Sequence, residues 1–97
     1  MAEHGIEPVV VEEIQTLARR HGVRRVILFG SRARGDFRPK SDIDLAVEGG
    51  DFINFSLDVD EGTSTLRLFD FVDLGDAVPD ALRAVIENEG VVLYEQA

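Results

Sequence analysis

Residues 23–47 constrain the fold of this chain more than any other segment does. A run rich in β-branched and aromatic residues covers 23–29 and ends at Gly30-Ser31, which predicts a buried strand followed by a tight turn. The next alternating segment contains Asp42 and Asp44, one residue apart. Because side chains alternate between the two faces of a strand, both carboxylates are expected on one face and their apolar neighbours on the other.

The turn and the two carboxylates together predict a site for a metal-bound phosphate. Glycine at position 30 lets the backbone approach a ligand closely, and the N–H groups that begin at Ser31 are expected to face an anion. Mg²⁺ is usually bound by one or two carboxylates together with phosphate oxygens. Each motif alone is weak evidence, since most Gly-Ser pairs are simple turns and most Asp-x-Asp pairs are exposed charges. Their order along the chain makes the prediction more specific.

Helical and strand patterns alternate along the rest of the chain. The spacing of apolar residues and the glycine stops predict helices over 8–21, 52–61 and 80–89, one possible helical turn over 31–35, and strands over 23–29, 41–47, 66–74 and 91–94. The start of the second helix would also suit a strand. In 97 residues this alternation predicts a single domain over 1–97 with an α/β (α+β) fold, one small mixed sheet with helices packed on it. The pattern leaves the strand order open.

Charge is distributed unevenly along the chain. The net charge is −9, yet the segment from Arg19 to Lys40 holds eight of the ten basic residues and one acid, which leaves −16 for the remainder. The acidic total disfavours binding of long nucleic acids or anionic membranes. The basic segment is either a solvated helix end and loop or a region that attracts a small polyanion such as a nucleotide.

Several classes of protein are excluded by composition. The chain has no cysteine, which excludes disulfides and thiolate metal sites. Its longest apolar stretches, 26–29 and 91–94, fall far short of the ~20 residues that span a bilayer. The acidic amino terminus lacks the basic and then apolar pattern of a signal peptide. We therefore expect a cytoplasmic protein with no membrane partner.

Two motifs resemble a known superfamily. The sequences GSRARG at 30–35 and SDIDL at 41–45 resemble the signature of the DNA polymerase β-like nucleotidyltransferases. The stretch TLRLFDFVDL at 65–74 is similar to the minimal nucleotidyltransferases, the MntA-type antitoxins of HEPN/MNT toxin–antitoxin pairs. The similarity extends from the first helix to the segment 90–95. It implies the polymerase β-like fold and transfer of a nucleoside monophosphate from a triphosphate.

The resemblance also implies a third carboxylate on a neighbouring strand. The candidates are Asp70 and Asp73, which are three residues apart and therefore on opposite faces. Asp70 stands in the middle of an apolar run, where an unpaired carboxylate would be costly and would require a metal or a proton. Asp73, nearer the end of the run, is the more ordinary solvated charge. We expect Asp70 to be the third carboxylate.

The resemblance implies a two-metal reaction with ATP as the substrate. Two Mg²⁺ ions about 4 Å apart would clamp the attacking and leaving oxygens. The catalytic and metal-binding residues are then Asp42, Asp44 and Asp70. The nucleotide-binding residues are Gly30 and Ser31 at the outgoing phosphates, with Arg34, Arg38 or Lys40 neutralising charge there. Arg32 is either an exposed or a structural residue.

The acceptor is implied by the resemblance alone. The antitoxin family implies transfer of AMP from ATP to a hydroxyl, expected to be a tyrosine, on a cognate HEPN toxin that binds the chain as a hetero-oligomer. One alternative is a non-catalytic nucleotide-binding module that neutralises the toxin by direct contact. Another is nucleotidyl transfer to a small-molecule hydroxyl, which would require additional substrate-binding structure.

Overall fold

Helices and strands alternate throughout the part of the chain that is described. A computed structural model describes residues 4–96. The elements are α1 (Pro8–Arg20), β1 (Arg25–Phe29), α2 (Ser31–Arg34), β2 (Ile43–Glu48), α3 (Phe52–Gly62), β3 (Phe69–Asp73), α4 (Asp80–Glu89) and β4 (Val91–Glu95). Every helix and strand that the sequence pattern predicts is present, including the single turn α2. Within residues 4–96, no helix has the length and apolar character needed to cross a membrane.

The four strands form one mixed sheet in the order β3-β2-β1-β4. β1 pairs antiparallel with both β2 and β4, whereas β2 and β3 are parallel and are connected through α3. The predicted fold class, a small α+β domain with one mixed sheet, is therefore confirmed. β1 and β2 occupy the centre of the sheet, and β3 and β4 are its edges.

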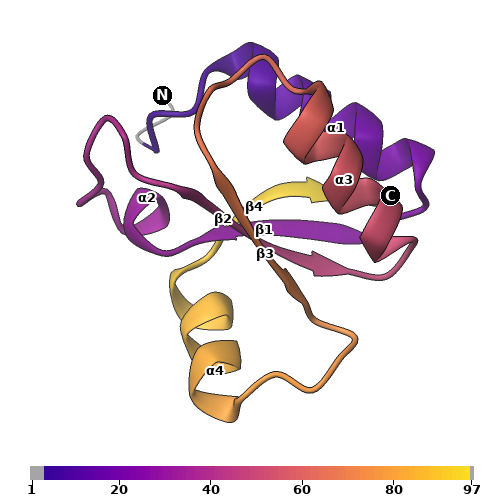
Figure 1. Cartoon of the computed structure of the whole chain (residues 1–97). Coiled ribbons are helices and arrows are strands. Elements are labelled where there is room, and N and C mark those ends of the chain that lie inside the picture. The colour runs from indigo at the N-terminus through magenta and orange to yellow at the C-terminus, as the bar shows by residue number, and fades with distance from the viewer. Residues whose placement is uncertain (1–3, 97) are drawn as a thin grey trace.

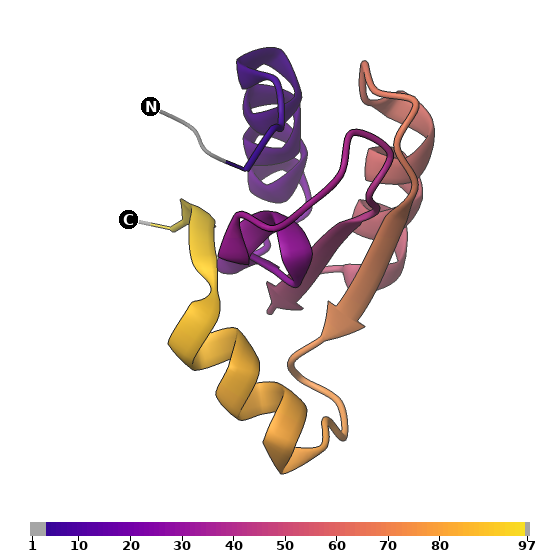
Figure 2. The ribbon, with the colours of Figure 1, turned by 90° about the vertical axis from the view of Figure 1, so that its left-hand side faces the viewer.

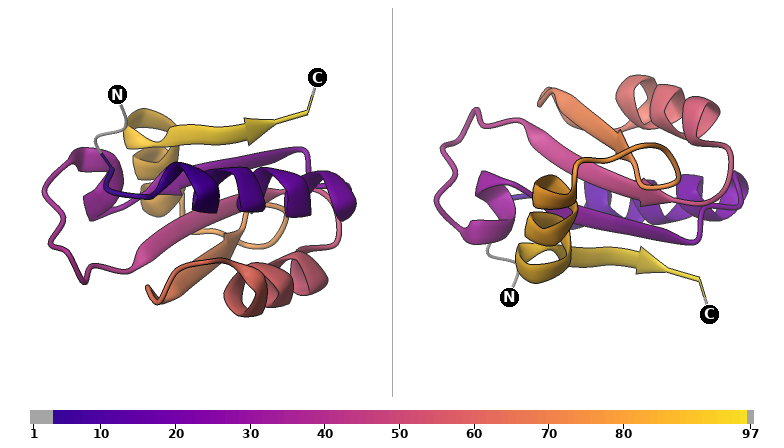
Figure 3. Two further views of the ribbon diagram at one scale, coloured as in Figure 1. Left: turned by 90° about the horizontal axis from the view of Figure 1, so that it is seen from above. Right: turned by 90° about the horizontal axis from the view of Figure 1, so that it is seen from below.

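The helices cover both faces of the sheet. In Figure 1, α1 and α3 lie on one face and α4 on the other, and the views in Figures 2 and 3 show the same layers. The predicted apolar stripe of α1 is buried, with Val10, Ile14 and Ala18 at most 1% exposed. At the carboxyl end of α1, His21 Nε2 lies 2.6 Å from Asp58 Oδ2 of α3. The buried residues form two separate cores, one under α1 and α3 and the other under α4.

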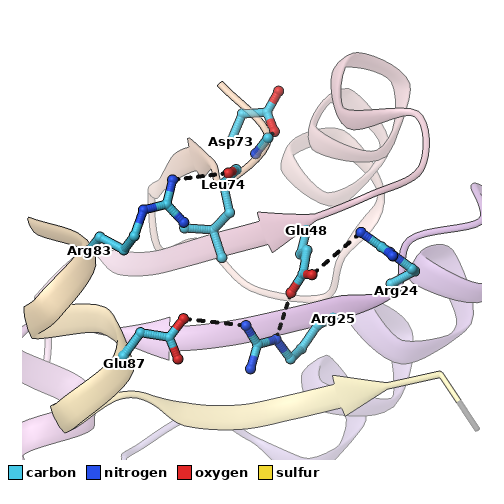
Figure 4. Close-up of polar contacts among 8 residues, drawn as sticks. Arg24, Arg25, Glu48, Asp73, Leu74, Arg83 and Glu87 are labelled. Carbon is cyan, nitrogen blue, oxygen red and sulfur yellow. Dashed lines mark hydrogen bonds and ion pairs between the residues drawn. The ribbon is translucent and has the colours of Figure 1, made fainter. Parts of the chain in front are cut away.

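Helix α4 is held on its face by the apolar side chains of Ile86 and Leu82 and by polar contacts. Ile86 packs with Ile27 and Ala46 of the central strands. Arg25 Nε donates to Glu48 at 2.8 Å, and the same guanidinium reaches Glu87 of α4 at 3.4 Å (Figure 4). Partly exposed ion pairs stabilise a fold only weakly, so these contacts orient α4 more than they stabilise it.

Three strands begin later than the sequence pattern predicts. β1 begins at residue 25 rather than 23, β2 at 43 rather than 41, and β3 at 69 rather than 66. In each case a turn holds the preceding residues. The N–H of Val23 donates to Ala18 at the end of α1, that of Ser41 donates to Arg38, and that of Arg67 donates to Thr65 Oγ1. These turns contain apolar residues, which resemble strand residues in the sequence, and the predicted strands are therefore too long at their starts.

Gly90 ends α4, but for a different reason from the one that the sequence suggests. The pattern predicts a C′ glycine, which usually has a left-handed conformation, whereas Gly90 is extended with φ −69°. A Cβ at this position would overlap Ile27 Cγ2 and the Ile86 carbonyl oxygen. Close packing between α4 and β1 therefore requires the glycine.

Candidate active site

The turn after β1 places Gly30 directly against Asp44. Gly30 is the N-cap residue of α2 and has φ 78°, a conformation that favours glycine. A Cβ at this position would overlap Asp44 Oδ2. Ser31 is the first residue of α2 and is half-buried. The structure thus brings the Gly30-Ser31 turn and the second aspartate of the motif to the same corner of the sheet.

Asp42 and Asp44 lie at the start of β2. Asp44 is half-buried and is paired in register with Phe29, the last residue of β1, while Asp42 precedes the strand and is exposed. Ile43 and Leu45 are at most 1% exposed and belong to the core under α1 and α3. Because side chains alternate along a strand, Asp44 is on the opposite face, the one that α4 covers.

Asp70 is the direct neighbour of Asp44 across the parallel pair β2–β3. The structure therefore brings this sequence-predicted carboxylate to the motif. Asp70 is exposed, however, so the expected cost of an unpaired carboxylate within an apolar run does not arise. β3 is an edge strand, and its two phenylalanines, Phe69 and Phe71, pack against the core on the other face. The two phenylalanines thus face the core under α1 and α3, and Asp70 is on the other face of β3.

The carboxylates act on one another electrostatically. Burial raises the pKa of Asp44 to about 6, and the nearby charge of Asp70, a hydrogen bond with the same residue and the charge of Asp42 contribute to the increase. The guanidinium of Arg34 acts in the opposite direction. Negative charge is therefore concentrated where the Gly30 turn meets β2.

Asp73 has a different environment from Asp70 on the same strand. It is half-buried, and its Oδ1 accepts a hydrogen bond from the Gly75 N–H at 2.9 Å. This bond stabilises the turn that follows β3. Asp73 thus has a local structural role, and the choice of Asp70 as the third carboxylate stays a prediction.

The paired carboxylates of Asp44 and Asp70 fit a divalent cation chemically. Within residues 4–96, no three His, Cys, Asp or Glu side chains converge closely enough to hold an ion. Mg²⁺ nevertheless requires only one or two carboxylates when substrate phosphates complete its coordination. The raised pKa of Asp44 reflects an excess of negative charge beside Asp70, and a cation would relieve it.

The basic residues near the turn differ in their relation to this cluster. Arg34 is close enough to lower the pKa of Asp44, although it also pairs with Asp36 at 3.4 Å and with Glu89 at 3.8 Å. Arg38 and Lys40 are exposed in the loop before β2. The structure therefore brings Arg34 to the aspartates, and the two loop residues stay predictions as phosphate ligands.

Arg32 has a structural role that the sequence left undecided. Its side chain is only 3% exposed and lies over the ring of Phe37. The guanidinium donates to the carbonyl oxygens of His4 at 2.9 Å, Ser41 at 2.9 Å and Pro39 at 3.3 Å. One side chain therefore joins α2, the segment before α1 and the loop that leads to Asp42. In the sequence, Arg32 lies between Ser31 and Arg34, two expected phosphate ligands, and this position does not indicate a structural role.

Replacing Arg32 with alanine should destabilise the fold by about 3 kcal/mol, because three carbonyl groups lose a charged donor at a buried site. Arg32→Lys should recover little, since an ammonium group does not reproduce the planar fork of donors. Urea denaturation measures the effect. The control is Arg38→Ala, an exposed position at which a change below about 0.5 kcal/mol is expected. Equal losses for Arg32→Ala and Arg38→Ala would contradict the structural role.

The sequence matches a known protein family and a curated relative. The family model described as polymerase beta, nucleotidyltransferase, matches residues 12–97. The matched range contains the turn after β1 and all three aspartates. A curated relative from Methanocaldococcus jannaschii, provisionally named a protein adenylyltransferase, is 33% identical over 67 residues. The match covers 69% of this chain and 56% of that relative, so the chain spans only about half of the relative's length.

Solved structures share the fold. A crystal structure of a toxin-antitoxin with AMP-PNP has a TM-score of 0.71 at 24% identity, covering 89% of this chain and 73% of that chain. A mutant of the toxin-antitoxin MntA-HpeT gives 0.68 at 23% identity with the same coverage. A provisionally named nucleotidyltransferase from Sulfolobus solfataricus gives 0.56 at 21% identity, covering 91% and 78%. At these identities the similarity establishes the fold alone.

Proposed function

Because the chain belongs to the polymerase beta nucleotidyltransferase family, we propose that it transfers AMP from ATP to a hydroxyl group of a partner toxin and so acts as an antitoxin. The observation that carries the proposal is the pairing of Asp44 with Asp70 at the Gly30 turn. Phosphate binding and two adjacent carboxylates are the two requirements of metal-assisted nucleotidyl transfer. The Gly30 turn lies against Asp44 and Asp44 is paired with Asp70, and this arrangement supports the proposal.

Each group has a defined role in the proposed reaction. The backbone N–H groups from Ser31 onward bind the outgoing phosphates, and Arg34 neutralises charge beside them. Asp42, Asp44 and Asp70 would hold two Mg²⁺ ions, which would supply positive charge to the attacking and leaving oxygens. The acceptor oxygen bonds to the α-phosphorus, and the bond from that phosphorus to the bridging oxygen breaks. Pyrophosphate leaves, and Asp70 takes the proton of the hydroxyl.

Comparisons with known proteins support ATP as the donor and a toxin as the acceptor. One similar structure contains AMP-PNP and belongs to a toxin-antitoxin, and the curated relative carries the name of an adenylyltransferase. The finer parts of the proposal follow the resemblance of the segment 65–74. They are a HEPN toxin as the partner in a hetero-oligomer, a tyrosine as the acceptor, and the cytoplasm as the location.

The test uses ATP labelled on the α-phosphate, Mg²⁺ and the purified product of the adjacent gene. Label should move to that protein, and mass spectrometry should place AMP on a tyrosine. ATP labelled on the γ-phosphate is the matched control, because its label leaves with pyrophosphate. Transfer of the γ-label would indicate a kinase instead. A partner that is neutralised without receiving any label would favour inhibition by contact.

ATP binding can be measured without the partner. Mg²⁺ and ATP at about a hundredfold excess over Kd should stabilise the protein by roughly 2.7 kcal/mol, because only the native state offers the site. The melting temperature reports this change. An unchanged melting temperature at millimolar ligand would contradict the nucleotide site, whatever the acceptor proves to be.

A further inference from the structure

An apolar groove lies between α3 and the edge strand β3, outside the proposed active site. It encloses about 360 Å³, and its walls include Phe52, Ile53 and Leu57 of α3 and Phe69 and Phe71 of β3. Ile53 is 69% exposed and Leu57 is 50% exposed. Exposed apolar side chains gathered around a concave surface are typical of protein-binding sites.

An unpaired polar group lies beneath the wall of the same groove. Ser56 is one of its wall residues, and the hydroxyl oxygen of Ser56 is buried without a hydrogen-bond partner among residues 4–96. A buried polar group that lacks a partner costs free energy. Because this oxygen is buried, it lies beneath the wall of the groove rather than at its surface.

β3 connects the groove to the proposed active site. Phe69 and Phe71 form one wall of the groove, and Asp70 lies between them on the opposite face of the same strand. β3 is at the edge of the sheet, so no further strand separates the groove face from the Asp70 face. A molecule seated in the groove therefore needs only to pass around one exposed strand to reach Asp70.

Charge around the groove favours a basic occupant. Helix α3 and its N-cap residue Asp51 carry four acidic residues and no basic residue. Asp60 is itself a wall residue. In a symmetric contact between two copies, these acidic surfaces would face each other and repel. The groove is thus better suited to a different protein whose apolar side chains are surrounded by lysine or arginine.

We propose that the groove between α3 and β3 is the docking surface for the acceptor protein, a partner with an apolar anchor and a basic rim. This proposal rests on the proposed function and adds to it the surface by which the acceptor is recognised. Docking in the groove holds the partner beside β3, and its hydroxyl reaches Asp70 around the edge of the sheet.

The test compares two substitutions at matched exposure. Leu57→Lys places a positive charge in the groove, and Val92→Lys places the same charge on β4, where Val92 is 49% exposed against 50% for Leu57. With the adjacent gene's product as the acceptor, Leu57→Lys should raise its KM about tenfold or more with kcat within about twofold. Val92→Lys should leave both constants near the wild-type values. An equal stabilisation of both variants by Mg²⁺ and ATP shows that the fold and the nucleotide site are intact.

Failure of this proposal and failure of the proposed function give different results. AMP transfer with the same acceptor KM in Leu57→Lys and Val92→Lys would overturn the docking surface and leave the activity in place. Complex formation, measured by titration calorimetry, does not depend on catalysis. Binding that is lost in Leu57→Lys and kept in Val92→Lys supports the docking surface even if no AMP is transferred. Absence of any complex with the wild-type chain would overturn it.

Discussion

Replacing Asp44 with asparagine is expected to lower AMP transfer at least about a thousandfold while making the ligand-free protein more stable. The loss follows from removal of the central carboxylate of the cluster, whose place beside Asp70 and the Gly30 turn makes it the best-positioned metal ligand. The gain follows from removal of a charge that burial and two neighbouring carboxylates disfavour. Opposite changes in activity and stability distinguish a functional site from a structural one.

The stability gain should depend on pH in a defined direction. Folding raises the pKa of Asp44 to about 6, so the folded state holds this proton more tightly than the unfolded state does. The ionised form of Asp44 therefore destabilises the folded state. This loss of folding free energy is absent well below the unfolded pKa of ~3.9, grows as the pH rises from there, and is complete above the folded pKa of about 6. Asp44→Asn should therefore raise the melting temperature at pH 8 and leave it nearly unchanged at pH 3.5. After allowance for solvent screening, about 1 kcal/mol is expected at pH 8.

Two aspartates of β3 provide the controls for this prediction. Asp70→Asn should lose AMP transfer to a similar extent, because Asp70 is proposed both to bind metal and to take the proton. Asp73→Asn should keep most of the activity, since an amide oxygen can still accept the bond from the Gly75 N–H. Equal losses at Asp70 and Asp73 would contradict the assignment of the third carboxylate. Labelled ATP measures the activities and thermal unfolding measures the stabilities.

Gly30→Ala is expected to have the second largest effect. The added methyl group would occupy the position of Asp44 Oδ2 in a residue with φ 78°, so Asp44 must move or the turn must open. A displacement of about 1 Å at a catalytic group can cost about a hundredfold in rate. We therefore expect AMP transfer to fall at least about a hundredfold. The ligand-free protein should lose more than about 2 kcal/mol, from overlap and backbone strain together.

Gly35→Ala separates overlap from strain. Gly35 has φ 88°, but a Cβ there would meet nothing within 4 Å. Backbone strain alone should cost about 1 kcal/mol and leave AMP transfer within a few-fold of the wild type. Urea denaturation and the labelled-ATP assay compare the two variants directly. If Gly35→Ala reduced transfer as strongly as Gly30→Ala, contact between the turn and Asp44 would not explain the effect.

Local pattern was sufficient to predict the elements of the fold. The apolar residues of α1 recur at helical spacing and are buried, and the strand that carries Asp44 alternates as predicted. The segment 31–35, which the pattern predicts as one possible helical turn, contains the one-turn helix α2. The starts of β1, β2 and β3 were placed too early because apolar residues in turns resemble strand residues. Hydrogen bonds from those turns, which a pattern does not reveal, determine where the strands begin.

Two features of the candidate site depended on contacts between distant segments. Asp70 was selected as a carboxylate in an apolar run, yet it is exposed because β3 is at the edge of the sheet. Arg32 is adjacent in sequence to expected phosphate ligands, yet it is buried on three carbonyl groups. The groove between α3 and β3 likewise exists only where these two elements pack together.

The sequence by itself determined the secondary structure, the glycine turn and the spacing of Asp42 and Asp44, because helical and strand periodicities are local and alternate side chains share a face. Only the tertiary structure decided the strand order β3-β2-β1-β4. That order pairs Asp70 with Asp44 and leaves β3 exposed at the edge. Pairing between strands depends on how all the helices and strands pack together, so no single segment of the sequence encodes it.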